Sequence, residues 1–159
     1  MIFVTVGTDQ PFDRLIRIVD EWSKQNQRTD VFAQIGKTAT PPTHIAYSEF
    51  LEPREFTERF SSADLIIAHA GMGTILSALR FGKPILIFPR IAALGEQRNE
   101  HQMATARRLS SMGKVNVAFD DATLREMLQQ LDTLKPKEAI GASASEELTN
   151  SIKKFIAQC

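Results

Sequence analysis

The sequence predicts an α/β fold in which a parallel sheet of about six strands has helices on both faces. Two patterns lead to this fold class. Short apolar runs rich in β-branched residues alternate along the chain with stretches whose apolar residues recur at helical spacing, as in repeated βα units. Most of the strand-like runs are apolar on both faces, which is typical of strands covered by helices on each side. The length of 159 residues fits one domain.

Six segments are predicted to be the strands of this sheet. They are Ile2–Val6, Asp30–Ile35, His44–Phe50, Asp64–His69, Pro84–Phe88 and Lys114–Phe119. All apolar runs are much shorter than the roughly 20 residues that a membrane-spanning helix needs. The start of the chain is apolar but has no basic flank, so we expect no signal peptide.

Helices are predicted where apolar residues recur three or four positions apart. Pro11 lies near the start of the first, Pro53 opens a second, Gly113 ends a later one, and Asp121 caps the next. The apolar positions of these four helices are Phe12, Leu15, Ile16, Val19 and Trp22; Phe56 and Phe60; Met103, Ala106, Leu109 and Met112; and Leu124, Met127, Leu128, Leu131 and Leu134.

The chain divides into three parts. Residues 1–134 are expected to form the domain, residues 135–145 a connector, and residues 146–159 a last helix, with Ser143 and Glu146 at the spacing of a capping box. Packing on the domain's own sheet and binding to a partner protein both remain open for the apolar face of this helix. That face consists of Leu148, Ile152, Phe155 and Ile156.

Charge and cysteine content exclude two classes of protein. The chain has 19 Lys plus Arg and 19 Asp plus Glu, so overall charge does not attract it to nucleic acid. The single cysteine, Cys159, has no partner for a disulfide within the chain, which predicts the reducing cytoplasm rather than secretion.

Functional residues are expected in the loops that follow the strands, because open parallel sheets bind ligands outside the carboxyl ends of their strands. Four such segments contain glycine or hydrogen-bonding side chains: 7–10, 36–38, 69–74 and 90–102. No Cys/His cluster, H-E-x-x-H or D-x-D motif is present in the sequence, so we expect no metal or other cofactor.

The segment 69–74 is the most informative of the four. Gly71, Gly73 and Thr74 stand between a buried strand and a helix, where backbone amides lack partners and a phosphate can approach closely. Leu76 occupies the place of the third glycine of a dinucleotide-binding motif, so that class of site is excluded. From spacing alone, a phosphate site and a tight turn that packs a helix on a strand are about equally supported.

The segment 95–102 contains seven hydrogen-bonding side chains. Such a set suits a polyhydroxyl ligand, because a sugar needs donors and acceptors around its ring. A solvated loop with Asn99 as a helix cap is the alternative. His69, Arg90 and His101 are further candidates for binding an anion.

Several stretches, in this order along the chain, resemble a known family. They are VTVGT at 4–8, FDRLI at 12–16, HAGMGTIL at 69–76, GKP at 82–84, PR at 89–90, and GE and HQ at the two ends of 95–102. The sequence through about residue 113 resembles the nucleotide-sugar-binding C-terminal domain of family 28 glycosyltransferases. Within that family it is most similar to small subunits of two-subunit transferases of dolichol-linked glycan and bacterial exopolysaccharide synthesis. The resemblance implies a Rossmann-like domain, the C-terminal half of a GT-B enzyme.

The resemblance also implies roles for individual residues. Glu96 or Glu100 is expected to help bind the ribose, because this chain has Ser77 where related transferases commonly use an acidic residue. The backbone near Phe50 and Leu51 would bind the uracil edge. The remaining assignments are Gly7, Thr8, His69, Gly71, Gly73 and Thr74 for the diphosphate, and Asn99, His101 and Gln102 for sugar hydroxyls.

By the same resemblance, the protein would be an inverting, metal-independent glycosyltransferase. It would transfer a hexose or N-acetylhexosamine from a UDP-sugar to a lipid-linked acceptor. A second, membrane-associated subunit would supply the acceptor domain, and it would recruit the chain to the cytoplasmic face of the membrane. Two alternatives remain: a nucleotide-binding or regulatory subunit without catalysis, and a self-sufficient small transferase acting as a homodimer. No catalytic residue is assigned.

Overall fold

The structure is a computed structural model that describes residues 1–38, 40–113, 115–134, 150 and 153–154. The predicted connector, residues 135–145, lies outside this range. So do Leu148, Ile152, Phe155 and Ile156 of the predicted last helix. The division of the chain into three parts therefore stays a prediction.

Six parallel strands form one sheet, as the sequence predicts, with shorter bounds than the apolar runs suggest. They are β1 (Ile2–Thr5), β2 (Val31–Gln34), β3 (Ala46–Ser48), β4 (Leu65–His69), β5 (Ile85–Phe88) and β6 (Asn116–Val117). Their order in the sheet is β3-β2-β1-β4-β5-β6, and Val4 of β1 is paired with Ala33 on one side and Ile67 on the other.

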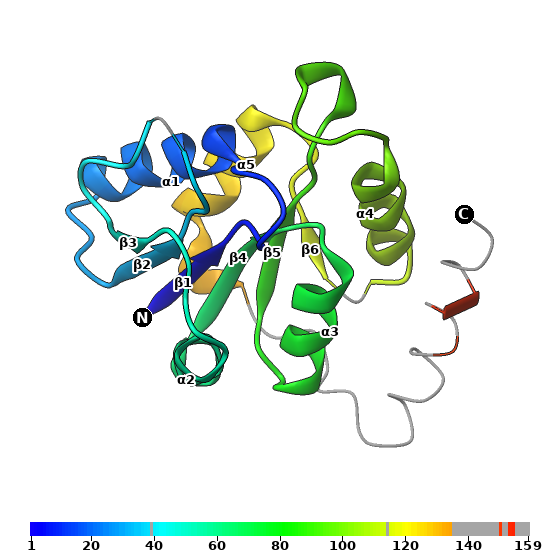
Figure 1. The fold of residues 1–159 in the computed structure, drawn as a ribbon, viewed down its shortest axis with the longest axis horizontal. Coiled ribbons are helices and arrows are strands. Elements are labelled where there is room, and N and C mark those ends of the chain that lie inside the picture. The colour runs from blue at the N-terminus through cyan, green and yellow to red at the C-terminus, as the bar shows by residue number, and fades with distance from the viewer. Residues whose placement is uncertain (39, 114, 135–149, 151–152, 155–159) are drawn as a thin grey trace.

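Helices cover both faces of this sheet (Figure 1). Helices α1 and α5 lie on one face, and α2, α3 and α4 on the other. Their bounds are α1 (Asp13–Gln25), α2 (Pro53–Ser62), α3 (Met72–Arg80), α4 (His101–Ser111) and α5 (Asp121–Gln129). Within the described part of the chain, two short 3-10 helices cover Ala92–Leu94 and Leu131–Thr133.

Alternation along the central strands divides the buried residues into two cores. In β1, the side chain of Val4 packs in the core under α1 and α5, whereas Phe3 packs in the core under α2, α3 and α4. In β5, Phe88 packs in the core under α1 and α5, and Ile87 packs in the core under α2, α3 and α4. Both faces of the central strands are therefore apolar, which explains why their sequences show no polar alternation.

The start and end of α5 differ from the prediction. Asp120, rather than Asp121, is the N-cap, and its carboxylate accepts a hydrogen bond of 2.7 Å from the amide of Thr123. Asp121 is the first helical residue and pairs with Arg14 instead. The helix ends at Gln129, so Leu131 lies in the 3-10 helix and Leu134 lies just beyond it. The apolar spacing continues past the end of the α-helix, because the side chains of Leu131 and Leu134 still pack on the same core.

The strand order reverses between β1 and β4. From β1 the chain first builds β2 and β3 on one side and then returns to build β4, β5 and β6 on the other. At such a switch point the loops after the two central strands separate and leave a crevice. In Figure 1 these loops lie at the upper edge of the sheet, above the carboxyl ends of β1 and β4.

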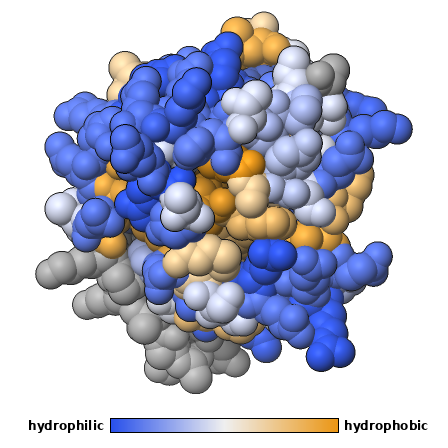
Figure 2. All heavy atoms as spheres, turned by 90° about the vertical axis from the view of Figure 1, so that its left-hand side faces the viewer, coloured by the Kyte–Doolittle hydropathy of each residue, from blue (hydrophilic) through white to orange (hydrophobic). Residues whose placement is uncertain are grey.

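The outer surface at the β3 end of the sheet is mostly hydrophilic, with a smaller hydrophobic area in its middle (Figure 2). Among the described residues, no helix is both long enough and apolar enough to cross a membrane.

Candidate functional site

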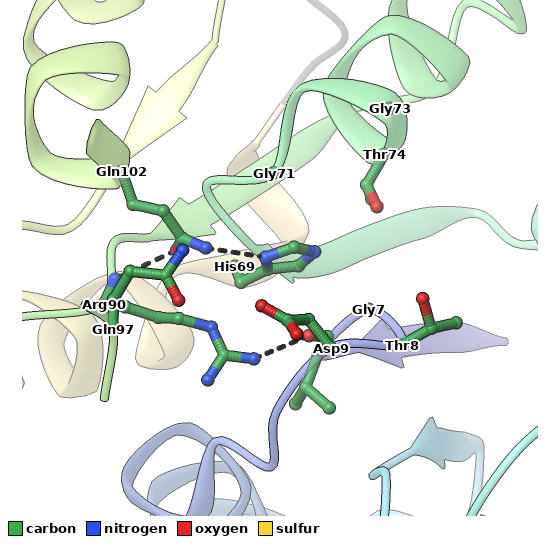
Figure 3. Close-up of a pocket in the computed structure, with 11 residues that line it drawn as sticks. Gly7, Thr8, Asp9, His69, Gly71, Gly73, Thr74, Arg90, Gln97 and Gln102 are labelled. Atoms are coloured by element: carbon green, nitrogen blue, oxygen red, sulfur yellow. Dashed lines mark hydrogen bonds between the residues drawn. The ribbon is translucent and has the colours of Figure 1, made fainter. Parts of the chain in front are cut away.

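A pocket opens at the switch point, above the carboxyl ends of β1, β4 and β5 (Figure 3). It is lined by Val6, Gly7, Thr8, Asp9, His69, Gly71, Gly73, Thr74, Arg90, Gln97 and Gln102. The structure therefore brings together all six residues expected at a diphosphate, although they come from two segments more than 60 positions apart in the sequence. We call this the switch-point pocket.

Helix α3 contributes free backbone donors to the switch-point pocket. The helix begins at Met72, so Gly73 and Thr74 belong to its first turn and not to a loop in front of it. The first amide bonded within the helix is that of Ile75, which donates to the carbonyl of Gly71 at 3.1 Å. The preceding amides, including those of Gly73 and Thr74, have no partner inside the helix. Free amides at a helix N-terminus suit an anion.

The two glycines of this segment have different roles. A Cβ on Gly73 would meet no atom within 4 Å, so the position faces the open pocket. A Cβ on Gly71 would come within 2.1 Å of His69 Cε1, and one on Gly7 within 2.8 Å of His69 Nε2. Gly7 also has a φ of +78°, which disfavours any other residue. Gly7 and Gly71 therefore make room for an imidazole, and Gly73 alone leaves room for a ligand.

Gln102 holds the loops of the pocket together. Its side chain is buried, and Oε1 accepts hydrogen bonds from the amides of Ala70, at 3.2 Å, and Arg90, at 3.1 Å. Its Nε2 lies 3.1 Å from His69 Nδ1. Because two amides donate to Oε1, the orientation of the Gln102 amide is determined. We expected this side chain to bind sugar hydroxyls; its oxygen is already used within the protein.

The contact with Gln102 also determines the tautomer of His69. Gln102 Nε2 can only donate, so His69 Nδ1 accepts and the ring proton of the neutral imidazole is on Nε2. This nitrogen points away from Gln102, toward the side of the pocket where Thr8 and Thr74 lie (Figure 3). Burial, and secondly the positive charge of Arg90, lower the pKa of His69 from 6.5 to about 4. At neutral pH His69 is an uncharged donor facing the pocket.

The lowered pKa of His69 predicts a pH dependence of stability. The unfolded chain binds this proton near pH 6.5 and the folded protein near pH 4, so acidification below 6.5 favours unfolding. Between about pH 7.5 and pH 5, we expect His69 to reduce the free energy of unfolding by about 2 kcal/mol. Urea unfolding at both pH values measures this loss, with His69→Gln as the control because glutamine does not titrate. If both proteins lost the same free energy, the pKa of folded His69 would be near 6.5.

A second pocket adjoins the first and shares Gly7, Thr8, Gly73 and Thr74 with it. Its other lining residues are Thr5, Gln34, Leu51, Pro53, Phe56, Thr57 and Ser77. Leu51 and Ser77, expected at the base and the ribose, therefore lie beside the diphosphate residues. The Ser77 hydroxyl donates to the carbonyl of Gly73 at 2.8 Å. The Oε1 atom of Gln34 is buried and has no hydrogen-bond partner among the described residues.

Other expected site residues line neither pocket. Glu96 accepts two hydrogen bonds from Arg14, at 2.8 and 2.9 Å, and one from the amide of Ile91. Its carboxylate is therefore bound within the protein and lines neither pocket, and its binding to the ribose stays a prediction. The carboxylate of Glu100 accepts from the amide of Ala92, again outside both pockets.

Phe50 and two polar residues of the segment 95–102 are also outside the two pockets. Phe50 is 51% exposed. The Asn99 side chain accepts from the amide of His101 at 3.0 Å, but the N-cap of α4 is Glu100, so the expected helix cap at Asn99 is one residue off. His101 is exposed. The structure therefore does not bring Phe50, Asn99 or His101 to the site.

Three lining residues, Val6, Asp9 and Gln97, are absent from the sequence prediction. Asp9 directly follows Gly7 and Thr8 in the loop after β1, and Gln97 is part of the polar segment before α4. Their position in loops after strands was a usable signal, but many other polar residues share it.

Comparisons with known proteins agree with this fold. The sequence profile of the glycosyltransferase family 28 C-terminal domain matches residues 1–159. Over 123 residues, the chain is 32% identical to UDP-N-acetylglucosamine transferase subunit ALG13 of Homo sapiens, covering 70% of this chain and 10% of that protein. A second relative is a UDP-N-acetylglucosamine–N-acetylmuramyl-(pentapeptide) pyrophosphoryl-undecaprenol N-acetylglucosamine transferase of Prochlorococcus marinus. The chain is 30% identical to it over 124 residues, which cover 65% of this chain and 33% of that protein. The chain thus spans a tenth and a third of these two relatives.

Two solved structures share the fold. The solution structure of ALG13 has a TM-score of 0.63 and 21% identity, and the similarity covers 92% of this chain and 93% of that one. The crystal structure of Acinetobacter baumannii MurG has a TM-score of 0.58 and 20% identity, covering 96% of this chain and 49% of that one. Because the profile matches the whole sequence, the protein belongs to the family of glycosyltransferase family 28 C-terminal domains.

Proposed function

We propose that this chain binds the UDP-sugar donor of a glycosyltransferase that acts on a lipid-linked acceptor. The observation that carries this proposal is the switch-point pocket, where free amides at the start of α3 and the Nε2–H group of a neutral His69 face the same space. Donors fixed in this way suit a diphosphate, the charged part of such a substrate.

The arrangement of the two pockets supports an orientation for the ligand. Gly7, Thr8, Gly73 and Thr74 line both pockets, so a molecule that spans them has its middle against these residues. In a UDP-sugar the middle is the diphosphate. The nucleoside then lies in the second pocket beside Leu51, and the sugar lies in the switch-point pocket on the side of Gln97.

The proposed reaction is transfer with inversion at the anomeric carbon. The acceptor oxygen forms a bond to that carbon from one side while the bond to the diphosphate breaks on the other. The bonding electrons leave with UDP, and the proton of the acceptor passes to a base. Negative charge therefore grows on the diphosphate, where the amides of α3 and His69 Nε2–H stabilise it. We propose that these groups, rather than a divalent metal, offset the charge of the leaving group.

A second polypeptide is part of this proposal. The human relative is named a transferase subunit, and this chain covers about half of the MurG chain. We propose that the partner supplies the acceptor-binding half and the base, and that it holds the chain at the cytoplasmic face of the membrane.

Calorimetric titration with UDP, ADP, GDP and a panel of UDP-sugars, in the presence of EDTA, tests the donor assignment. We expect UDP to bind more tightly than ADP or GDP, and EDTA to make no difference. UDP-N-acetylglucosamine is the first sugar nucleotide to test, because both relatives are named for it. Equal affinity for the three diphosphates, or binding that EDTA abolishes, would contradict the proposal.

A further inference from the structure

Arg90 is a buried arginine whose side chain is bound by neutral groups. It is 2% exposed, although arginine is among the residues least often buried. Its Nη1 donates to the carbonyls of Pro11, at 2.8 Å, and Glu96, at 3.3 Å; its Nη2 donates to those of Val6, at 2.8 Å, and Gln10, at 2.5 Å. The guanidinium also lies 4.8 Å from the centre of the Phe12 ring. Four carbonyl dipoles accept from its two Nη atoms and bring no negative charge to cancel that of the guanidinium.

Arg14 shows the contrast within the same chain. It is also largely buried, but it donates to both carboxylate oxygens of Glu96 and to Asp121 at 2.6 Å. Among the described residues Arg90 forms no ion pair. A buried charge without a counter-charge is unfavourable, and burial lowers the pKa of Arg90 while Glu96 and Asp9 act in the opposite direction. A guanidinium nevertheless stays charged at neutral pH.

The uncancelled charge lies in the wall of the switch-point pocket. Arg90 lines this pocket, and its backbone amide donates to Gln102, the residue that also holds His69. Its charge is one of the two causes that keep His69 neutral. Three of the four carbonyls that it binds, those of Val6, Gln10 and Pro11, belong to the segment after β1 that includes Gly7 and Thr8. Arg90 and this segment lie together in the pocket wall (Figure 3).

We propose that Arg90 is the fixed counter-charge of the bound diphosphate, acting from within the pocket wall without contact. The inference rests on the proposed function and deepens it. With its donors bound to carbonyls, the guanidinium attracts the diphosphate through space, most strongly when the leaving group gains charge. Asp9, an exposed carboxylate on the same pocket, weakens this attraction.

Affinities for UDP and for uridine, measured by NMR titration, separate charge from shape because uridine has no phosphate. We expect Arg90→Met to weaken UDP binding at least about tenfold and uridine binding less than about threefold. Arg90→Lys keeps the charge and loses the forked hydrogen bonds, and we expect it to retain most of the preference for UDP. Arg14→Met is the matched control, since its charge is already paired, and it should change both affinities by a similar factor.

Asp9→Asn is the second variant, and as an exposed substitution it leaves the fold intact. We expect UDP to bind several-fold more tightly and uridine unchanged. Unchanged or weaker binding of UDP would show that charges in this pocket wall do not act on the diphosphate through space and would overturn the proposal. Tighter binding, together with a UDP preference that Arg90→Lys retains and Arg90→Met loses, supports it; equal losses of UDP and uridine binding in both Arg90 variants would show that Arg90 only braces the loop and would also overturn it. A wild-type protein without preference for UDP over uridine would refute the proposed function itself.

Discussion

Valine at position 73 is expected to abolish UDP binding while the protein remains as stable as the wild type. Nothing lies within 4 Å of a Cβ at Gly73, so the folded protein has room for the side chain. The position is helical, where glycine is the poorest residue after proline, so stability should not fall. In the complex, however, the valine methyl groups would occupy the space against which the phosphates pack. Losing two amide bonds to a charged ligand corresponds to a loss of about 100-fold or more in affinity.

Gly71→Ala is the matched variant for this experiment. Its Cβ would come within 2.1 Å of His69 Cε1, so the imidazole must move or the protein must unfold. We expect Gly71→Ala to lower the free energy of unfolding by about 1–3 kcal/mol, as overpacked cores do. Calorimetry with UDP and urea unfolding distinguish the two glycines. Undiminished UDP affinity in folded Gly73→Val would show that the diphosphate lies elsewhere.

Replacement of Gln102 by methionine is expected to destabilise the protein by about 2–4 kcal/mol. Methionine fills a similar volume, but it leaves the buried amides of Ala70 and Arg90 without an acceptor, at about 1–3 kcal/mol each. His101→Met, an exposed change at the preceding position, serves as the control and should stay within about 0.5 kcal/mol of the wild type. Equal stability of the two variants in urea would mean that the amides find other partners.

Gln102→Met should also weaken UDP binding, because His69 Nδ1 loses its donor and the Nε2–H tautomer is no longer enforced. The nitrogen-15 chemical shifts of the His69 ring report the tautomer directly. We expect a protonated Nε2 in the wild type and a mixture of tautomers in the variant. A wild-type ring protonated on Nδ1 would contradict the assignment.

The strands and layers of this fold are predictable because their determinants are local. Each predicted strand is present, since a run such as Pro84–Phe88 must be buried on both faces and is too short for a helix. The helix over Asp121–Gln129 shows the limit of this reasoning. The apolar spacing continues to Leu134 because the following 3-10 helix faces the same core, so the pattern alone does not mark the end of the α-helix.

The candidate site is predictable in its position but not in all of its roles. The loops after β1 and β4 must meet at one edge of a parallel sheet, which explains why Gly7 and Gly73 line a common pocket. The different roles of Gly71 and Gly73 depend on where the His69 ring lies, and residue spacing does not encode this. Likewise, Glu96 is held by Arg14, a partner 82 positions away.

A crystal structure of the protein with UDP tests the central claim most directly. We predict that the diphosphate lies against the amides of Gly73 and Thr74, within hydrogen-bond distance of His69 Nε2, with the uridine beside Leu51. Arg90 should keep its four carbonyl partners and make no contact with the phosphates. UDP bound outside the switch-point pocket, or phosphates turned away from the start of α3, would contradict this account of the protein.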